Sequence, residues 1–141
     1  MDDLYRENIL DHYNHPRNSG HLEHPTVTAE GVNPLCGDEL SVELLVEDGV
    51  VTDVRYNGRG CAISQAAASM ISESVKGRPV SEVQQLGKDE VLDELGISLM
   101  PLRLKCAMLS VGVLKVALAD LEGQPAPEWG EDGDGITWKS G

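Results

Sequence analysis

The feature that most constrains the fold is residues 39–58, ELSVELLVEDGVVTDVRYNG. Val42, Leu44 and Val46 alternate with residues of a second face, and the alternation resumes after a central Asp48-Gly49 pair. Aspartate followed by glycine is a favoured hairpin turn, because glycine tolerates the positive φ that such turns need. These residues therefore predict an antiparallel hairpin, and a third strand is expected near residues 26–30.

Helical patterns flank the hairpin on both sides. Apolar residues recur at helical spacing in residues 4–13, and an alanine-rich stretch at 62–76 ends at Gly77, a typical C-cap residue. A loosely helical region covers 80–95, and Pro101 precedes a last helix at about 104–121. The order predicts an α+β fold, with a small antiparallel three-stranded sheet and helices packed on one face.

Length and composition indicate one domain followed by a tail. The 141 residues suit a single core, which we place at residues 1–122. From Gly123 the chain is acidic and rich in proline and glycine, so residues 123–141 are expected to be irregular or mobile, with Trp129 and Trp138 able to fold back onto the domain.

The charge excludes several classes of partner. There are 24 acidic residues against 11 basic ones, a net charge of −13. Nucleic acid and anionic membranes need a basic face, so neither is expected as a partner. The sequence has no apolar run long enough to span a membrane and no signal peptide pattern, which predicts a cytoplasmic protein. Three cysteines in a reducing compartment argue against a disulfide framework.

The three cysteines lie at predicted junctions between elements. Cys36 precedes the hairpin, Cys61 follows it, and Cys106 opens the last helix. Such junctions can meet at one edge of a small fold, and thiolates bind zinc in tetrahedral sites. Asp38 is then the nearest candidate for a fourth ligand. Inert burial of each cysteine is the alternative, but the glycines around Cys36 and Cys61 favour a shared metal or sulfur site.

Other candidate groups are assigned structural roles. The four histidines at positions 12, 15, 21 and 24 lie in a helix and a turn-rich stretch, and we do not expect them to form a metal site. Ser64 and Ser69 have no histidine nearby in the sequence, so hydrolase chemistry has no support.

Four segments together resemble the IscU/SufU family of iron–sulfur cluster assembly proteins, also seen as the N-terminal domain of NifU. They are LYRENILDHYNHPRNSG, NPLCGDELSVEL, GRGCAISQAAASMISESVKG and LRLKCAMLSVGVLKVAL, which span Leu4 to about Leu121. The resemblance implies that Cys36, Asp38, Cys61 and Cys106 hold a zinc ion in the purified protein. In scaffold members the same residues hold iron or a 2Fe–2S cluster. A hard, exchangeable carboxylate beside soft thiolates suits a site that must release its cargo.

The chain combines features of two branches of the family. IscU members usually carry histidine before the third cysteine, within a Leu-Pro-Pro-Val-Lys segment that a chaperone reads. Here Lys105 takes the histidine's place and only Pro101 matches the chaperone motif, so chaperone recognition is not expected. Arg103 and Lys105 resemble SufU, but the short interval between Cys61 and Cys106 leaves no room for the SufU insertion.

The resemblance implies a protein that works with a cysteine desulfurase and is not itself an enzyme. Persulfide sulfur would be accepted by Cys36 in the SufU mode or by Cys106 in the IscU mode, with Arg103 and Lys105 in support. The product would pass to downstream cluster or sulfur acceptor proteins. Three hypotheses stay open: a cluster scaffold, a zinc-dependent sulfur acceptor, and a structural zinc-binding domain without sulfur chemistry.

Overall fold

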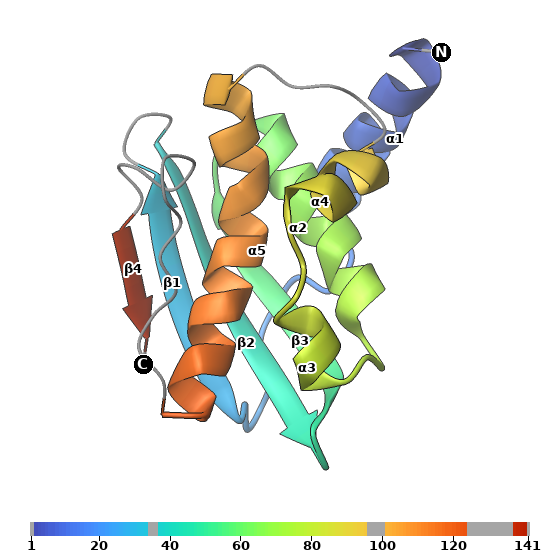
Figure 1. Ribbon diagram of the computed structural model, residues 1–141. Coiled ribbons are helices and arrows are strands. Elements are labelled where there is room, and N and C mark those ends of the chain that lie inside the picture. Colours follow the sequence, from blue (N-terminus) through green and yellow to red (C-terminus); the bar gives the residue numbers. More distant parts are fainter. Residues whose placement is uncertain (1, 34–36, 96–100, 124–136, 141) are drawn as a thin grey trace.

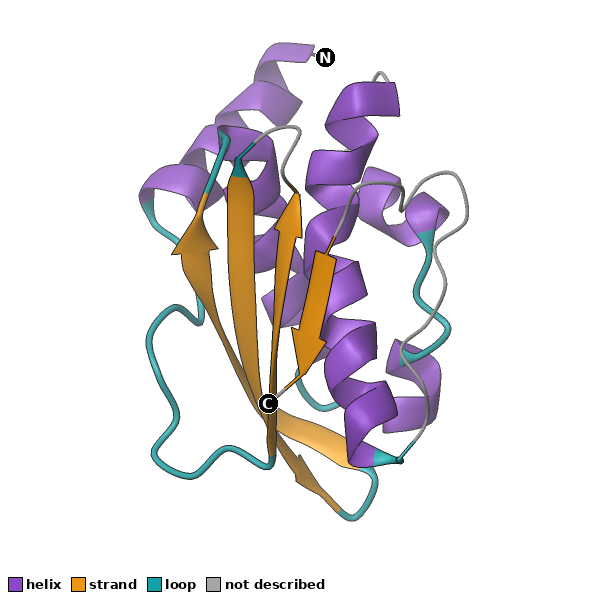
Figure 2. Cartoon of the chain, turned by 90° about the vertical axis from the view of Figure 1, so that its left-hand side faces the viewer, coloured by secondary structure: helices purple, strands orange, loops and turns teal. Residues whose placement is uncertain are grey.

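The computed structural model describes residues 2–33, 37–95, 101–123 and 137–140. Within these ranges the chain forms an antiparallel sheet with its helices packed on one face (Figures 1 and 2). The strands lie in the order β3-β2-β1-β4. Their bounds are β1 Val27–Asn33, β2 Asp38–Glu47, β3 Val50–Arg59 and β4 Thr137–Ser140.

The predicted hairpin is confirmed as β2 and β3. The turn residues Asp48 and Gly49 have φ angles of 53° and 75°, the positive values that a tight hairpin turn requires. Leu44 pairs with Val54 and Val42 with Tyr56, so the apolar residues of the two strands share the face that the helices cover. The third predicted strand is β1, which pairs antiparallel with β2.

The helices bury this face of the sheet. Their bounds are α1 Asp2–Asn14, α2 Ala62–Val75, α3 Val80–Val83, α4 Lys88–Leu95 and α5 Pro101–Leu121. The fully buried side chains include Leu44, Ile71 and Leu114, contributed by β2, α2 and α5. The Tyr56 hydroxyl donates a hydrogen bond to the Ser110 carbonyl at 2.8 Å and thereby ties β3 to α5. Burial of this apolar area is the main force that holds the two layers together.

Three details differ from the sequence prediction. Pro101 does not stand before the last helix but is its first residue, where the missing N–H of proline costs nothing. The loosely helical region divides into α3 and α4. The segment Thr137–Ser140 is not irregular: it forms β4, which extends the three-stranded sheet and places Trp138 opposite Gly31 of β1.

The division at residue 122 stays a prediction, because residues 124–136 lie outside the described ranges. In the part of the chain that is described, no helix combines the length and the apolar character that crossing a membrane requires.

Candidate metal centre

The topology brings the elements that carry Asp38, Cys61 and Cys106 to one end of the molecule (Figure 1). The end of β1, the start of β2, the end of β3 and the first turns of α2 and α5 all lie at this end. Asn33 pairs with Asp38, so the strands on either side of Cys36 end here, although Cys36 itself lies outside the described residues. Cys61 is the N-cap of α2. Cys106 lies in the second turn of α5, not in the first as predicted, and its side chain is also outside the description.

Asp38 is the best-defined member of the site. It is the first residue of β2 and has no exposed surface. Its Oδ1 accepts a hydrogen bond of 2.9 Å from the backbone N–H of Cys61. A carboxylate in this position stabilises the start of α2, because the first N–H groups of a helix have no partner within the helix. Asp38 and Cys61, predicted as ligands 23 residues apart, are thus brought into direct contact.

The second oxygen of Asp38 indicates that the site suits a metal. Oδ2 is buried and has no hydrogen-bond partner among the described residues. Buried polar atoms in folded proteins are almost always paired, so an unpaired carboxylate oxygen calls for a ligand. The thiol of Cys61, whose backbone N–H binds the other oxygen of Asp38, is free, and the residue is partly exposed. A carboxylate and thiolates form a donor set that fits zinc or iron.

Gly60 makes room for the Asp38 carboxylate. A Cβ atom on Gly60 would overlap Asp38 Oδ1 and would also lie against the Ser64 hydroxyl. Ser64 is buried, and its hydroxyl donates to the Cys61 carbonyl at 3.0 Å. Glycine at position 60 therefore has a steric role: it lets the carboxylate approach the turn that carries Cys61.

The remaining site residues are only partly described. Within the described ranges, no three His, Cys, Asp or Glu side chains gather closely enough to hold a metal ion. Asp38 and Cys61 are two of the four predicted ligands; Cys36 lies outside those ranges, and the side chain of Cys106 is not described. Arg103 and Lys105 belong to the first turns of α5, but their side chains are not described. The four-residue site therefore stays a prediction.

Sequence reasoning missed a histidine–serine contact. Ser69 Oγ lies 2.7 Å from His12 Nδ1, although 57 residues separate the two in the chain. Ser69 Oγ also accepts the Arg17 backbone N–H at 2.9 Å, and Glu73 lies 3.8 Å from His12 Nε2. Ser69 is only 2% exposed, so the contact joins α1 to α2 and does not present a nucleophile. Helical spacing from the buried Ile9 was the available signal for burial of His12.

Burial of His12 lowers the pKa of its imidazole. Loss of solvation disfavours the charged form, and the Arg17 guanidinium acts in the same direction. Glu73 and Asp11 oppose this shift without reversing it. Among the other histidines, His21 pairs with Glu43 at 2.6 Å. These contacts agree with the expected structural roles of His12 and His21.

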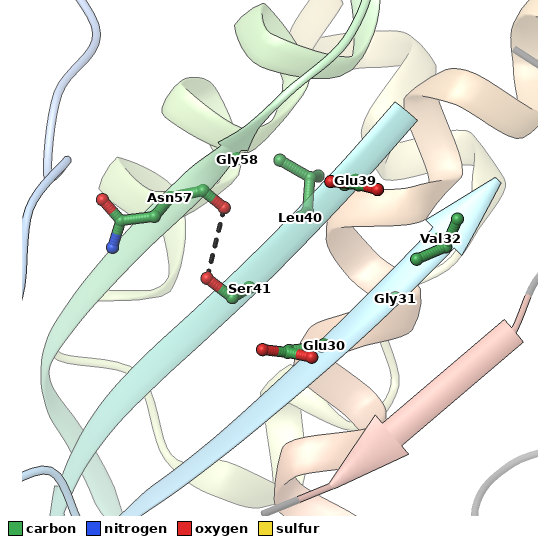
Figure 3. A pocket seen from close by; sticks show the side chains of 8 residues that line it. All are labelled: Glu30, Gly31, Val32, Glu39, Leu40, Ser41, Asn57 and Gly58. Atoms are coloured by element: carbon green, nitrogen blue, oxygen red, sulfur yellow. Dashed lines mark hydrogen bonds between the residues drawn. The ribbon is translucent and has the colours of Figure 1, made fainter. Parts of the chain in front are cut away.

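A groove of about 250 Å³ lies on the face of the sheet opposite the helices (Figure 3). Glu30, Ser41 and Asn57 are among the residues that line it, and the Ser41 hydroxyl donates to the Asn57 carbonyl at 3.3 Å. Glu39 pairs with Arg59 at 3.0 Å. Among the described residues that line this groove, neither Asp38 nor Cys61 appears.

Comparison with known proteins identifies the family. The family model described as the NifU-like N terminal domain matches residues 4–127. The chain belongs to this family. The chain is similar both to a SufU protein and to an IscU protein. It is 34% identical over 140 residues to the zinc-dependent sulfurtransferase SufU of Bacillus subtilis strain 168, covering 87% of this chain and 95% of SufU.

A second relative is named a cluster assembly scaffold protein instead of a sulfurtransferase. The iron–sulfur cluster assembly scaffold protein IscU of Thermotoga maritima is 40% identical over 131 residues, covering 82% of this chain and 92% of IscU. Among solved structures, a SUF-system cluster assembly scaffold protein of Fervidobacterium islandicum AW-1 superimposes with a TM-score of 0.71 at 26% identity, covering 79% of this chain and 94% of that one. The NifU-like N-terminal protein of Brucella abortus gives 0.70 at 25% identity, covering 88% and 98%. The sequence resemblance and the α+β fold are confirmed.

Proposed function

We propose that this protein takes part in iron–sulfur cluster assembly by accepting sulfur from a cysteine desulfurase. The observation that carries the proposal is the Asp38 carboxylate, buried against the Cys61 turn with one oxygen unpaired among the described residues. Cys36, Asp38, Cys61 and Cys106 would together hold a metal. Zinc, when bound, would keep the thiolates deprotonated and ordered.

The sulfur-transfer step that we propose needs no additional redox reagent. The acceptor thiolate, on Cys36 or Cys106, attacks the outer sulfur of a cysteine persulfide on the desulfurase. A new S–S bond forms on this protein while the S–S bond on the desulfurase breaks. The desulfurase cysteine leaves as a thiolate. The positive charge of Lys105 would favour a thiolate or persulfide at the neighbouring Cys106.

The relatives leave two modes open for the same site. One is named a zinc-dependent sulfurtransferase and the other a cluster assembly scaffold. Lys105, which resembles SufU, favours the sulfur acceptor. The short interval between Cys61 and Cys106 has no room for the SufU insertion and therefore favours the scaffold. A structural zinc domain without sulfur chemistry would need closed, unreactive ligands. The partly exposed Cys61 thiol and the carboxylate ligand favour an exchangeable site instead.

An anaerobic reaction distinguishes these modes. The full chain, with and without bound zinc, is mixed with the desulfurase of its own organism, cysteine and ferrous iron. Visible absorption reports cluster formation, and mass spectrometry locates sulfur on each cysteine. A stable chromophore on this chain indicates a scaffold. Sulfur on Cys36 or Cys106 without a chromophore, with zinc retained, indicates a sulfur acceptor. Absence of both would overturn the proposal and leave the structural zinc domain.

Replacement of Asp38 tests its role as a ligand. Asp38→Asn keeps an oxygen for the Cys61 N–H but removes the anionic ligand, and Asp38→Ala removes both. We expect each to weaken zinc binding by at least about tenfold while the chain stays folded. Asp120→Ala, at an exposed position near the end of α5, is the control. Unchanged zinc affinity and cluster lifetime in both Asp38 variants would exclude Asp38 as a ligand.

A further inference from the structure

A second polar cavity lies between α2, β3 and the segment that follows α1. Its volume is about 150 Å³, room for several water molecules or one small anion. The polar side chains that line it are Arg17, Ser19, Asn57, Gln65 and Ser69. Neither Asp38 nor Cys61 is among the described residues that line this cavity. One residue that lines it, Gln65, nevertheless lies one helical turn from Cys61, a predicted metal ligand. The Gln65 backbone N–H donates to the Cys61 carbonyl at 3.2 Å.

Two buried hydrogen-bond donors on this cavity lack partners. Arg17 Nη1 and Gln65 Nε2 are both shielded from solvent, and neither reaches an acceptor among the described residues. The one other side-chain atom with these properties in the described ranges is Asp38 Oδ2, which belongs to the metal centre. Two donors from different elements are thus left unpaired at the same cavity. Buried donors without acceptors are costly, and a bound ligand commonly satisfies them.

The neighbouring Asn57 and Ser69 side chains already have partners, and Ser19 is exposed to solvent. The Asn57 side chain accepts the Gly20 N–H at 3.2 Å and donates to the Gly20 carbonyl. Ser69 Oγ contacts His12 and the Arg17 backbone N–H. Asp11 pairs with Arg17 Nη2 at 2.7 Å and leaves Nη1 unpaired. The unmet hydrogen-bonding capacity is therefore carried by the Arg17 guanidinium and the Gln65 amide.

The chemistry of these groups selects an anion. Both are N–H donors, and among the described residues that line the cavity Arg17 is the one that carries a charge. A guanidinium repels metal ions and favours carboxylates and tetrahedral oxyanions, whose oxygens accept from two donors at once. We propose that this cavity binds one small anion, a carboxylate or a tetrahedral oxyanion, through Arg17 and Gln65. The proposal is independent of sulfur transfer, because it uses none of the metal ligands.

The test uses the full chain and three sodium salts: acetate, phosphate and sulfate, at ionic strength held constant with chloride. Thermal unfolding and NMR signals of the Gln65 side-chain amide and Arg17 Nε–H are followed against salt concentration. We expect a saturable change in both signals and a rise of about 2–5 °C in the unfolding midpoint. Saturation with acetate alone identifies a carboxylate site. Saturation with phosphate or sulfate alone identifies a tetrahedral oxyanion site, and saturation with all three identifies a general oxyanion site.

A substitution that introduces a negative charge distinguishes anion binding at this cavity from general effects of salt. In Gln65→Glu the new carboxylate can pair with Arg17 itself, so the saturable response to added anions should disappear without loss of folding. Gln85→Glu makes the same charge change at an exposed position and should respond as the unchanged protein does. Metal content, measured in parallel, shows whether a response originates at the metal centre. A response that never saturates, or one that persists in Gln65→Glu, would overturn the proposal.

Discussion

The carboxylate of Asp38 holds the start of α2 with one oxygen and has a second, buried oxygen unpaired among the described residues. Any change in the position of this side chain therefore affects both the helix terminus and the candidate metal site. Gly60 controls that position, since its missing side chain is what allows the carboxylate to lie against the Cys61 turn. At the scale of single residues, Gly60 is thus expected to influence metal binding although it is not a predicted ligand.

Gly60→Ala tests this steric role. The added methyl group would displace the Asp38 carboxylate, so we expect a loss of about 1–3 kcal/mol in the free energy of unfolding, together with weaker zinc binding. Urea unfolding and competition with a zinc chelator measure the two effects. Gly87→Ala is the matched control, because a Cβ atom there would meet nothing within 4 Å. Equal behaviour of the two variants would contradict the steric role of Gly60.

His12 should make stability depend on pH in a defined window. Its pKa is lowered in the folded state, chiefly by burial, from the ordinary value of 6.5. The unfolded chain therefore binds the proton more readily, and the free energy of unfolding should decrease as pH falls below about 6.5. The carboxyl groups with lowered pKa, Asp11, Glu43 and Asp53, have ordinary values of 3.8–4.5 and act at lower pH.

Urea unfolding at pH 7.5 and at pH 5.5 measures this dependence. His12→Gln should reduce the difference in unfolding free energy between the two pH values. His24→Gln, at an exposed histidine, should leave that difference unchanged. A pH dependence in His12→Gln as steep as in the unchanged chain would show that another group is responsible.

At the scale of elements, sequence patterns predicted those helices and strands whose formation depends on residues close together in the chain. The β2–β3 hairpin follows from its alternation and its Asp48-Gly49 turn, and α2 follows from an alanine-rich run that ends at Gly77. These signals lie within about twenty residues of each other. The contact of Asp38 with Cys61 was also within reach, because hairpin geometry returns the chain to its starting edge.

Long-range pairing was not predictable in the same way. Strand β4 pairs with residues 29–32, which lie more than a hundred positions earlier in the chain. Its four residues carry too little pattern to stand out beside the acidic, glycine-rich segment that precedes them. The contact of His12 with Ser69 likewise joins α1 to α2 across 57 residues. Such contacts depend on how elements pack, and packing leaves only weak traces in a single sequence.

Truncation tests the contribution of β4. Removal of residues 124–141 uncovers the β1 edge and eliminates four cross-strand pairs. We expect the free energy of unfolding to fall by roughly 1–3 kcal/mol, from the usual worth of such pairs. Zinc affinity should not change, because β4 pairs with residues 29–32, which include none of the predicted metal ligands. A shorter truncation, of residues 137–141, should cost the same if β4 alone is responsible. A loss confined to the longer truncation would assign the effect to residues 124–136.

At the scale of the whole molecule, the net charge of −13 governs how a partner approaches. A strongly charged protein attracts oppositely charged surfaces over distances comparable to the Debye length, about 10 Å at 0.1 M salt. If the desulfurase of the proposed function meets this chain through a basic surface, salt should slow the encounter more than it affects the separation of the complex.

Stopped-flow or surface-binding kinetics between 50 mM and 500 mM salt measure both rates. We expect the association rate constant to fall by about tenfold or more across this range, with a much smaller change in the dissociation rate constant. The variant Glu7→Gln/Glu23→Gln/Glu47→Gln neutralises three exposed acids and should have a shallower salt dependence. An association rate that is flat or rises with salt would mean that the acidic surface does not guide the encounter. Recognition would then depend on contacts at the metal-site end of the molecule, where the ends of the strands and the first turns of α2 and α5 lie together.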